Sequence, residues 1–147
     1  MTTEGNNFIL RIRALILHDG KLLVMRNSAN DFYCLPGGKM EIGETVHECL
    51  KREITEELGI PPQIGRLLFT NNYMEKNGDQ SVELIFEVTN VKDYLDEKNL
   101  KGTHSFEFND IYWMEKNDSK TFLPKPIQDS LNDGTLLSGT VRFLSDK

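Results

Sequence analysis

Gly37 to Ile60 reads GGKMEIGETVHECLKREITEELGI, a pair of glycines followed by a segment whose acidic residues crowd toward its end. Thr45 is a suitable N-cap residue, and Glu48 three positions later completes a capping-box pattern. Gly59, followed closely by two prolines, is a helix stop signal. We therefore predict one helix over about Thr45 to Leu58.

The acidic residues of this predicted helix do not form a separate polar face. At about 100° per residue its apolar residues share one stripe, which consists of Val46, Cys49, Leu50, Ile54 and Leu58. Glu53 and Glu57 fall within that stripe, and Glu56 flanks it. The three carboxylates should therefore turn toward the body of the protein, near the helix end where the macrodipole disfavours anions.

Such a carboxylate cluster needs a compensating cation. Arg52 is one candidate, although Glu48 and Glu56 each lie one helical turn away and can compete for it. A hard divalent cation, Mg²⁺ or Mn²⁺, is the better candidate, because these ions prefer oxygen ligands. A solvated acidic face that merely drifts across the apolar stripe is the alternative.

The spacing of these residues resembles a known motif. Gly38 is followed after five residues by Glu44, and after seven more by the run REITEELGI, residues 52–60. This pattern is similar, at every fixed position, to the Nudix box of the MutT-like Nudix hydrolase superfamily. The resemblance implies an α/β/α sandwich with a curved mixed β-sheet and with the box helix packed on one face.

The composition is that of a globular domain. The chain has 147 residues, which is long enough for one domain with a sizeable core. Its net charge of −6 argues against stable nucleic-acid binding, which favours a basic surface. We expect a single domain over residues 1–147, with residues 1–7 and the last few residues flexible.

Cysteine usage and the start of the chain indicate the compartment. Cys34 and Cys49 are the only cysteines, and they match neither a CxxC motif nor a zinc spacing, so we expect two thiols rather than a disulfide. The first ten residues lack the features of a signal peptide, and no segment approaches the ~20 apolar residues of a membrane span. We expect a cytoplasmic protein without a membrane partner.

The rest of the chain alternates between strand-like runs and turns. Asp19-Gly20 and Asn77-Gly78 are hairpin signals, and two prolines precede a short second helix over about Ile127 to Leu131. The predicted strands are Phe8–Leu17, Lys21–Arg26, Phe32–Leu35, Ile64–Tyr73, Ser81–Val88, Asp110–Met114 and Thr140–Leu144. Together these elements predict a mixed α/β (α+β) fold.

The Nudix resemblance implies a metal-binding role for the box. By position, Glu53, Glu56 and Glu57 would hold Mg²⁺ or Mn²⁺, and a carbonyl oxygen of Gly37 or Gly38 would add a ligand. Residues without Cβ allow such a close backbone approach. A tight turn before the helix is the alternative explanation of the glycine pair.

The same resemblance assigns roles in the reaction. Arg52 would orient the acids through charge-assisted hydrogen bonds, Glu44 would support them near the helix start, and Glu53 would take a proton from the attacking water. Pyrophosphate hydrolysis requires that developing charge be neutralised, water be activated and the attack be aligned. A carboxylate cluster with bound divalent metal meets these needs.

Some relatives use an acid further along the chain as the base or as an extra ligand. Glu107 is the candidate here, because it lies in a predicted loop shortly before the strand that contains Trp113. An ordinary loop glutamate is the alternative, and Asp96, Glu97 and Asp110 are competitors for the role.

The substrate-binding candidates carry weaker signals. Arg26 ends the first hairpin, where relatives keep a basic residue near the substrate, and Lys39 follows the glycines and could meet a phosphate. Phe32 and Tyr33 could stack on a base. The alternatives are surface positions for the two cations and core positions for the two aromatic residues.

These observations lead to one leading function. We expect a metal-dependent hydrolase that cleaves a pyrophosphate bond in a nucleoside diphosphate linked to another moiety, such as a nucleoside triphosphate or nucleotide sugar. Its partner would be that small molecule, and the resemblance also allows a homodimer. The alternatives are a catalytically silent Nudix-fold domain that binds a nucleotide, and a structural protein with an incidental acidic helix. P-loop, GxGxxG, GxSxG and HExxH motifs are missing from the sequence.

Overall fold

Strands make up most of the regular structure in the residues that the computed structural model describes, 7–101 and 108–146. In chain order the elements are β1 (Phe8–Leu15), β2 (Leu17–His18), β3 (Lys21–Asn27), β4 (Gly37–Lys39), α1 (Val46–Leu58), β5 (Ile64–Met74), β6 (Gln80–Val88), the 3₁₀ helices η1 (Val91–Tyr94) and η2 (Glu97–Asn99), β7 (Phe108–Met114), α2 (Lys125–Asp133) and β8 (Arg142–Asp146).

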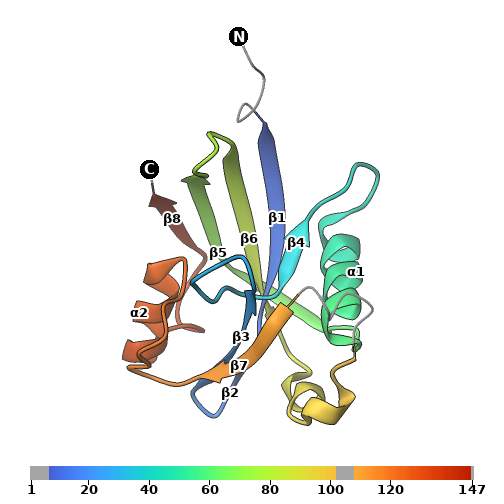
Figure 1. Ribbon diagram of the computed structural model, residues 1–147, viewed down its shortest axis with the longest axis vertical. Helices are drawn as coiled ribbons and strands as arrows, with labels where there is room; N and C mark the ends of the chain where they lie inside the picture. Colours follow the sequence, from blue (N-terminus) through green and yellow to red (C-terminus); the bar gives the residue numbers. More distant parts are fainter. Residues whose placement is uncertain (1–6, 102–107, 147) are drawn as a thin grey trace.

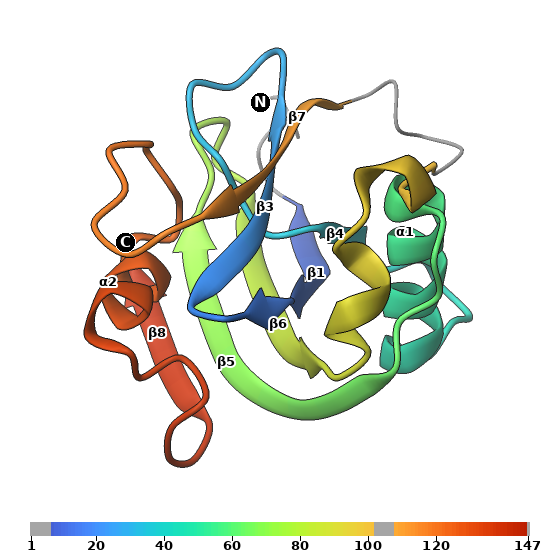
Figure 2. The same cartoon turned by 90° about the horizontal axis from the view of Figure 1, so that it is seen from below.

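The strands form two sheets. The larger sheet is mixed, with the order β4-β1-β6-β5-β8, and the smaller one is antiparallel, with the order β2-β3-β7. Figure 1 shows α1 and α2 on opposite sides of the strands, and Figure 2 shows the strong bend of β5. The expected mixed α/β sandwich is confirmed, although its strands are divided between two sheets.

Helix α1 begins and ends as predicted. The Thr45 hydroxyl accepts a hydrogen bond of 3.1 Å from the Glu48 N–H, and the Glu48 carboxylate accepts one of 2.9 Å from the Thr45 N–H. Gly59 adopts a left-handed conformation, with φ of 82°, and its N–H donates to the Thr55 carbonyl. The capping box and the glycine stop therefore fix both ends of the helix locally.

The first predicted strand, Phe8–Leu17, is wrong as a single element because it is interrupted at Ile16. β1 belongs to the larger sheet and β2 to the smaller one. Ile16 is fully buried, and its carbonyl accepts a hydrogen bond of 3.0 Å from the Leu23 N–H. The chain thus passes between sheets at a buried corner. The Asp19-Gly20 turn then joins β2 to β3 as predicted, with positive φ at both residues.

The strand predicted over Phe32–Leu35 is also wrong. Within the described residues this segment makes only isolated bridges, at Tyr33 and Cys34. The strand forms at the glycines instead, since β4 pairs antiparallel with β1, Gly37 opposite Arg13. A Cβ on Gly37 would lie 2.1 Å from the Ile12 carbonyl oxygen, so only glycine lets the chain approach β1 this closely.

The later elements match the predictions apart from their ends. β5, β6 and β7 contain the predicted strands and extend past them, whereas β8 begins two residues after the predicted Thr140. α2 is longer than predicted at both ends. Its earlier start at Lys125 is possible because Pro126 lies in the first turn, where a missing N–H loses no helical hydrogen bond. The charged segment from Lys92 to Lys101, which had no predicted element, contains all but the first residue of η1 and the whole of η2.

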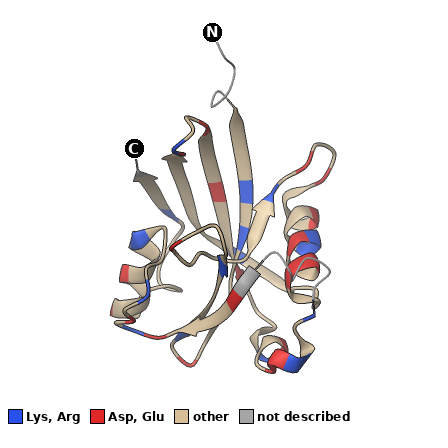
Figure 3. Cartoon of the chain, viewed as in Figure 1, with Lys and Arg blue, Asp and Glu red and all other residues tan. Residues whose placement is uncertain are grey.

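Charged side chains also occur within the larger sheet. Figure 3 shows basic positions on β1 and an acidic position on β6, besides the mixed charges of α1. Arg13 and Glu83 form an ion pair there, with 2.8 Å between Nε and Oε2, and Glu83 is 5% exposed. A buried ion pair loses the hydration of both charges, so its remaining donors and acceptors need hydrogen-bond partners within the fold.

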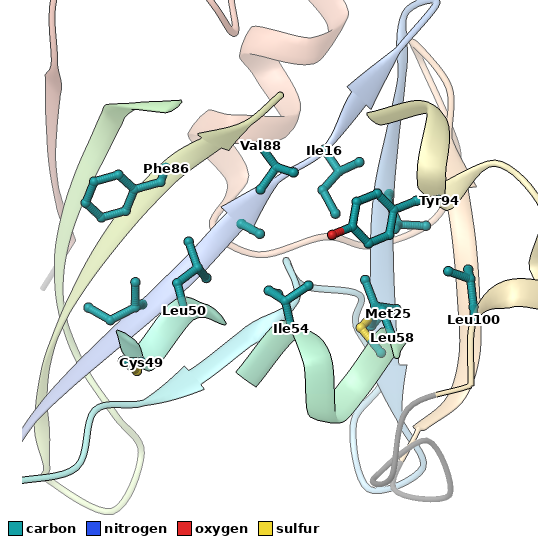
Figure 4. Packing of buried hydrophobic residues seen from close by; sticks show 13 residues of the cluster. Ile16, Met25, Cys49, Leu50, Ile54, Leu58, Phe86, Val88, Tyr94 and Leu100 are labelled. Carbon is teal, nitrogen blue, oxygen red and sulfur yellow. The ribbon is translucent and has the colours of Figure 1, made fainter. Parts of the chain in front are cut away.

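Two apolar clusters hold the helices to the strands. In one, Leu50, Ile54 and Leu58 of α1 meet Phe86 and Val88 of β6, together with Tyr94 of η1 (Figure 4). In the other, Ile127 and Leu131 of α2 pack against the opposite side of the strands. The two cysteines are free thiols, as predicted. In the described part of the chain no helix has the length and apolarity to cross a membrane.

Candidate active site

The carboxylates of Glu53 and Glu57 face the glycine strand β4. The fully buried Cys49, Leu50 and Ile54 fasten α1 to the larger sheet, and this fixes which side of the helix turns inward. Glu57 is 4% exposed, and the Glu53 side chain is 17% exposed. The inward-facing acids that the helical spacing predicts are therefore present.

Side chains of α1 cover the free edge of β4. β4 is an edge strand, and its Gly37 N–H donates a hydrogen bond of 2.8 Å to Oε1 of Glu57. Two residues along, the Lys39 carbonyl accepts one of 3.2 Å from Nη2 of Arg52. Backbone groups at a sheet edge need such partners. The charged side of α1 thus completes the hydrogen bonding of the glycine strand.

Gly38 provides the space in which the Glu53 carboxylate lies. A Cβ at Gly38 would lie 2.5 Å from both the carboxyl carbon and Oε2 of Glu53. A side chain at this position would therefore have to displace the carboxylate. The glycine pair serves two contacts at once, because Gly37 admits the backbone of β1 and Gly38 admits the acid of α1.

Arg52 connects the acids of the box. Its Nε and Nη2 donate to the two carboxylate oxygens of Glu44, at 3.0 and 2.8 Å. Its Nη1 donates to Glu53 at 2.9 Å and to Glu56 at 3.4 Å. Of the two competitors considered from the sequence, Glu56 contacts Arg52, whereas Glu48 serves the capping box. Arg52 is therefore one of the cations that balance the cluster.

The surroundings of Glu44 and Glu53 move their pKa values in opposite directions. Hydrogen bonds from Arg52, and then from the Glu41 N–H, lower the pKa of Glu44 to about 2. Burial raises the pKa of Glu53 above its ordinary value, with Arg52 opposing that shift. Neighbouring carboxyls whose pKa values are driven apart are typical of sites that carry out acid–base chemistry.

The donor set fits a hard divalent cation. Glu53, Glu56 and Glu57 supply carboxylate oxygens, which Mg²⁺ and Mn²⁺ prefer, and Gly38 leaves room for one of them beside the backbone. The acids are engaged by protein donors in this structure, and among the described residues no three His, Cys, Asp or Glu side chains are in an arrangement that holds a metal. Metal ligation would therefore require the carboxylates to turn away from those donors.

The carbonyls of the glycine pair, which were expected to add a ligand, have partners as well. The Gly37 carbonyl accepts a hydrogen bond of 3.2 Å from Nη1 of Arg13. The Gly38 carbonyl lies 3.9 Å from Sγ of Cys49, which donates to it weakly. A carbonyl oxygen has two lone pairs, so the contact with Arg13 leaves the Gly37 carbonyl with capacity for a second partner.

Arg26 belongs to a second polar cluster at the ends of β3 and β7. Its guanidinium donates twice to Oδ2 of Asp110, at 3.2 and 2.8 Å, and the Tyr33 hydroxyl donates to the same oxygen at 3.1 Å. The hydrogen bond from Arg26, and then that from Tyr33, lower the pKa of Asp110. A carboxyl with a lowered pKa is a weaker base, which counts against Asp110 as the proton acceptor.

The other candidates are scattered. The Lys39 side chain is exposed, Phe32 is partly buried, and Tyr33 is a core residue at 7% exposure. Asp96 accepts a hydrogen bond from the Lys98 N–H and caps η2. Glu107 lies outside the described residues. The structure therefore gathers the residues of the box, and it places Arg26 in a separate cluster.

Sequence reasoning missed Arg13, Glu83 and Asn71. Arg13 donates to the Gly37 and Leu35 carbonyls, both at 3.2 Å, and Asn71 donates to Glu83 at 3.1 Å. For Arg13 and Glu83 the available signal was charge in the interior of strand-like runs, at positions that alternate with apolar residues. That signal marks the residues as unusual, but it does not identify their partners.

Two surface hollows of about 180 and 300 Å³ lie away from this cluster. Both are lined in part by Leu17 and Leu137, and none of their lining residues belongs to the 37–60 segment. The location of the candidate site therefore depends on its carboxylates and glycines rather than on the shape of a cavity.

Comparison with known sequences agrees with this arrangement. The NUDIX domain family matches residues 9–132. The Nudix hydrolase YvcI of Bacillus subtilis, itself uncharacterized, is 30% identical over 92% of this chain and 88% of its own length. The nucleoside triphosphatase NudI of an Enterobacter species is 34% identical over 76% of this chain and 77% of its own. An ADP-ribose pyrophosphatase of Methanocaldococcus jannaschii is 42% identical, over 39% of this chain and 36% of its own.

Comparison with solved structures shows the same fold. The MutT Nudix hydrolase of Burkholderia pseudomallei superposes with a TM-score of 0.70, over 90% of this chain and 99% of its own, at 21% identity. The box residues, the α/β/α layering and the extent of the family match all agree. The chain therefore belongs to the Nudix hydrolase superfamily.

Proposed function

We propose that the protein is a Mg²⁺- or Mn²⁺-dependent pyrophosphohydrolase that acts on a nucleoside diphosphate linked to another moiety. The observation that carries this proposal is the position of two box carboxylates, Glu53 and Glu57, against the glycine strand, with Glu56 next to them through its contact with Arg52. Family membership supports the hydrolase class, and the names of two relatives, a nucleoside triphosphatase and an ADP-ribose pyrophosphatase, support the substrate class.

The box carboxylates would hold the divalent metal, with a carbonyl of Gly37 or Gly38 as an additional ligand. A bound divalent cation supplies neutralisation of phosphoryl charge and acidification of water at neutral pH. To ligate the metal, Glu53 and Glu56 would give up their contacts with Arg52 and bind the cation instead. Arg52 would remain attached through Glu44, whose two hydrogen bonds to it are the shorter set on average. Glu44 would thus keep the arginine in place.

Protein groups would carry the proton and orient the substrate. Glu53 would accept a proton from the attacking water, and burial, which raises its pKa, makes it a stronger base than an exposed carboxylate. The water oxygen would bond to phosphorus while the bond from phosphorus to the bridging oxygen breaks, which yields two phosphate-containing products. Glu107 is the alternative base. Lys39 and Arg26 would contact phosphates, and Phe32 would contact the base.

Substrate choice within the class would depend on the segments around the box. Residues 27–31 begin at the last residue of β3, and Arg26, the residue before it, reaches into the segment through a hydrogen bond of 3.3 Å to the Asn30 carbonyl. The second segment runs from Lys92 to Glu107. Residues in both are expected to decide between nucleoside triphosphates, nucleotide sugars and ADP-ribose.

The deciding experiment is a nucleotide panel with product identification. Purified protein is incubated with nucleoside triphosphates, nucleotide sugars and ADP-ribose, with Mg²⁺, with Mn²⁺ and with a chelator. We expect metal-dependent cleavage of at least one compound and a product that identifies the attacked phosphorus. Binding without turnover of any compound would instead favour the catalytically silent nucleotide-binding domain.

Variants of α1 test the assigned roles. Glu56→Gln and Glu57→Gln should remove most of the metal-dependent turnover while the protein stays folded. Glu48→Gln is the matched control, because it makes the same charge change on the same helix and glutamine also completes a capping box. Turnover of the two variants at the control level would refute the roles of Glu56 and Glu57.

A further inference from the structure

Arg13 reaches the glycine strand from β1, and it lies close enough to α1 to interact electrostatically with Glu57 and Glu53. It lies on β1 directly opposite Gly37 of β4, and its Nη1 donates to the carbonyls of Leu35 and Gly37, each at 3.2 Å. Its Nε donates to Oε2 of Glu83 at 2.8 Å. The guanidinium therefore joins the middle of the sheet to the chain just before and at the start of β4.

The partners of Arg13 are themselves fixed. Glu83 is 5% exposed and Asn71 is 4% exposed, and the Asn71 amide donates to the other carboxylate oxygen of Glu83 at 3.1 Å. Burial by itself lowers the pKa of Arg13, but the Glu83 carboxylate and further groups around the guanidinium, Glu57 among them, together outweigh burial and raise it, so the guanidinium stays charged. Three strands thus contribute to one buried polar network.

Stability alone does not explain this network. A buried ion pair is often no more stabilising than apolar side chains of similar volume, because both charges lose their hydration. The ion pair instead fixes the orientation of the Arg13 guanidinium. A planar guanidinium anchored by a carboxylate presents its remaining N–H groups in a fixed orientation, and these N–H groups meet two backbone carbonyls.

Gly37 is the point at which the network meets the candidate site. Its carbonyl accepts from Arg13 and its N–H donates to Glu57, so the residue is held from both sides. Its φ of 139° and its close approach to Ile12 leave no other residue type for the position. The next residue, Gly38, packs against the Glu53 carboxylate. Any rotation at Gly37 would therefore be transmitted to both acids.

We propose that Arg13 is a positioning residue for the candidate active site. Acting through the Leu35 and Gly37 carbonyls, it fixes the backbone of Gly37 and Gly38 against which Glu53 and Glu57 are arranged to hold a divalent cation. This inference rests on the proposed function, and it adds a residue outside the box that sets the metal affinity of the box.

The primary test is Arg13→Met, which keeps an unbranched apolar stem and removes all donors. Arg11→Met is the matched control, since Arg11 lies two residues earlier on the same strand and face, and its side chain bonds Glu75 at 3.2 Å. The readout is the Kd for Mn²⁺ without substrate, measured by the electron paramagnetic resonance of free Mn²⁺, at a temperature where circular dichroism shows each variant folded.

The two variants should separate clearly. We expect Arg13→Met to raise the Mn²⁺ Kd about tenfold or more, the usual effect of removing a group that orients ligands. Arg11→Met should stay within about twofold, because it removes an ion pair of the weakly contributing kind. A folded Arg13→Met protein with the wild-type Kd would overturn the inference, because a merely stabilising residue leaves the affinity of the folded protein unchanged.

A second variant and a second readout cover the remaining cases. If Arg13→Met does not fold, Arg13→Lys serves instead, because an ammonium group cannot reproduce the fork of donors to Glu83 and two carbonyls. The Gly37 amide resonance reports the backbone directly, and it should shift in either Arg13 variant and not in Arg11→Met. An unshifted Gly37 resonance would refute the positioning role of Arg13, whether or not the protein binds Mn²⁺. Failure of the wild-type protein to bind Mn²⁺ is a different result, and it would refute the proposed function.

Discussion

The carboxylate of Glu53 lies in the space that a side chain at Gly38 would occupy. A Cβ at Gly38 would lie 2.5 Å from the carboxyl carbon of Glu53, although the two residues belong to different elements, β4 and α1. The close approach is possible only because β4 carries no side chain at this point. It places a carboxylate that is largely shielded from solvent directly against backbone, and this makes the position of the acid sensitive to a single methyl group.

Gly38→Ala should therefore impair catalysis more than stability. The added methyl meets the far end of a flexible side chain, which can move, so we expect the free energy of unfolding to change by about 1 kcal/mol or less. Displacing Glu53 by about 1 Å should reduce kcat roughly 100-fold. Urea unfolding and steady-state kinetics measure the two effects. Because the loss acts through Glu53, adding Gly38→Ala to Glu53→Gln should have little further effect, and additive losses would contradict the explanation.

Gly37→Ala, in contrast, should mainly reduce the stability of the protein. Here the methyl would meet backbone atoms, the Ile12 carbonyl oxygen at 2.1 Å and the Arg13 Cα at 2.8 Å, and φ is 139°. Backbone of a central strand cannot move aside cheaply, so we expect a loss of about 3 kcal/mol or more in the free energy of unfolding. Thermal and urea denaturation measure this loss. A stability equal to that of Gly38→Ala would show that β4 is not held as closely to β1 as described.

Thr45→Ala should destabilise the protein without moving the acids. The Thr45 hydroxyl accepts the Glu48 N–H, and losing that bond at an N-cap costs about 1 kcal/mol. Thr45→Ser is the control, because it keeps the acceptor oxygen. We expect the midpoint of urea unfolding to fall for alanine and to stay near wild type for serine. Equal midpoints for the two variants would mean that the cap contributes nothing to stability.

The box helix was predictable because its determinants are local. Thr45, Glu48 and Gly59 fix its ends, and the 3.6-residue period places Glu53 and Glu57 on the same side as Ile54. The clustering of the box residues was predicted from the same local sequence pattern. The assignment of the chain to the Nudix superfamily, made from the spacing of Gly38, Glu44 and the residues after Arg52, is confirmed by the family match.

The errors concern contacts between distant parts of the chain. Ile16 breaks the first strand because its carbonyl pairs with Leu23 at a corner between sheets, and β4 forms at Gly37 because β1 lies beside it. Both depend on how strands associate, which strand-like patterns do not specify. The link between Arg13 and Glu83 spans 70 positions, so no local pattern could pair them.

Acid should weaken the Glu44–Arg52 link, and this gives a prediction with a definite sign. The pKa of Glu44 is about 2 in the folded protein and has an ordinary value of 4.5, so folding favours its ionised form. The stability from this pair is therefore fully present above about pH 4.5 and is lost as the pH falls toward 2. Glu44→Gln removes the ionisation. The difference in free energy of unfolding between wild type and Glu44→Gln, measured by urea at several pH values, should be largest at neutral pH and shrink through this window. A difference that stayed constant down to pH 2 would show that the Glu44 charge contributes nothing to the link with Arg52.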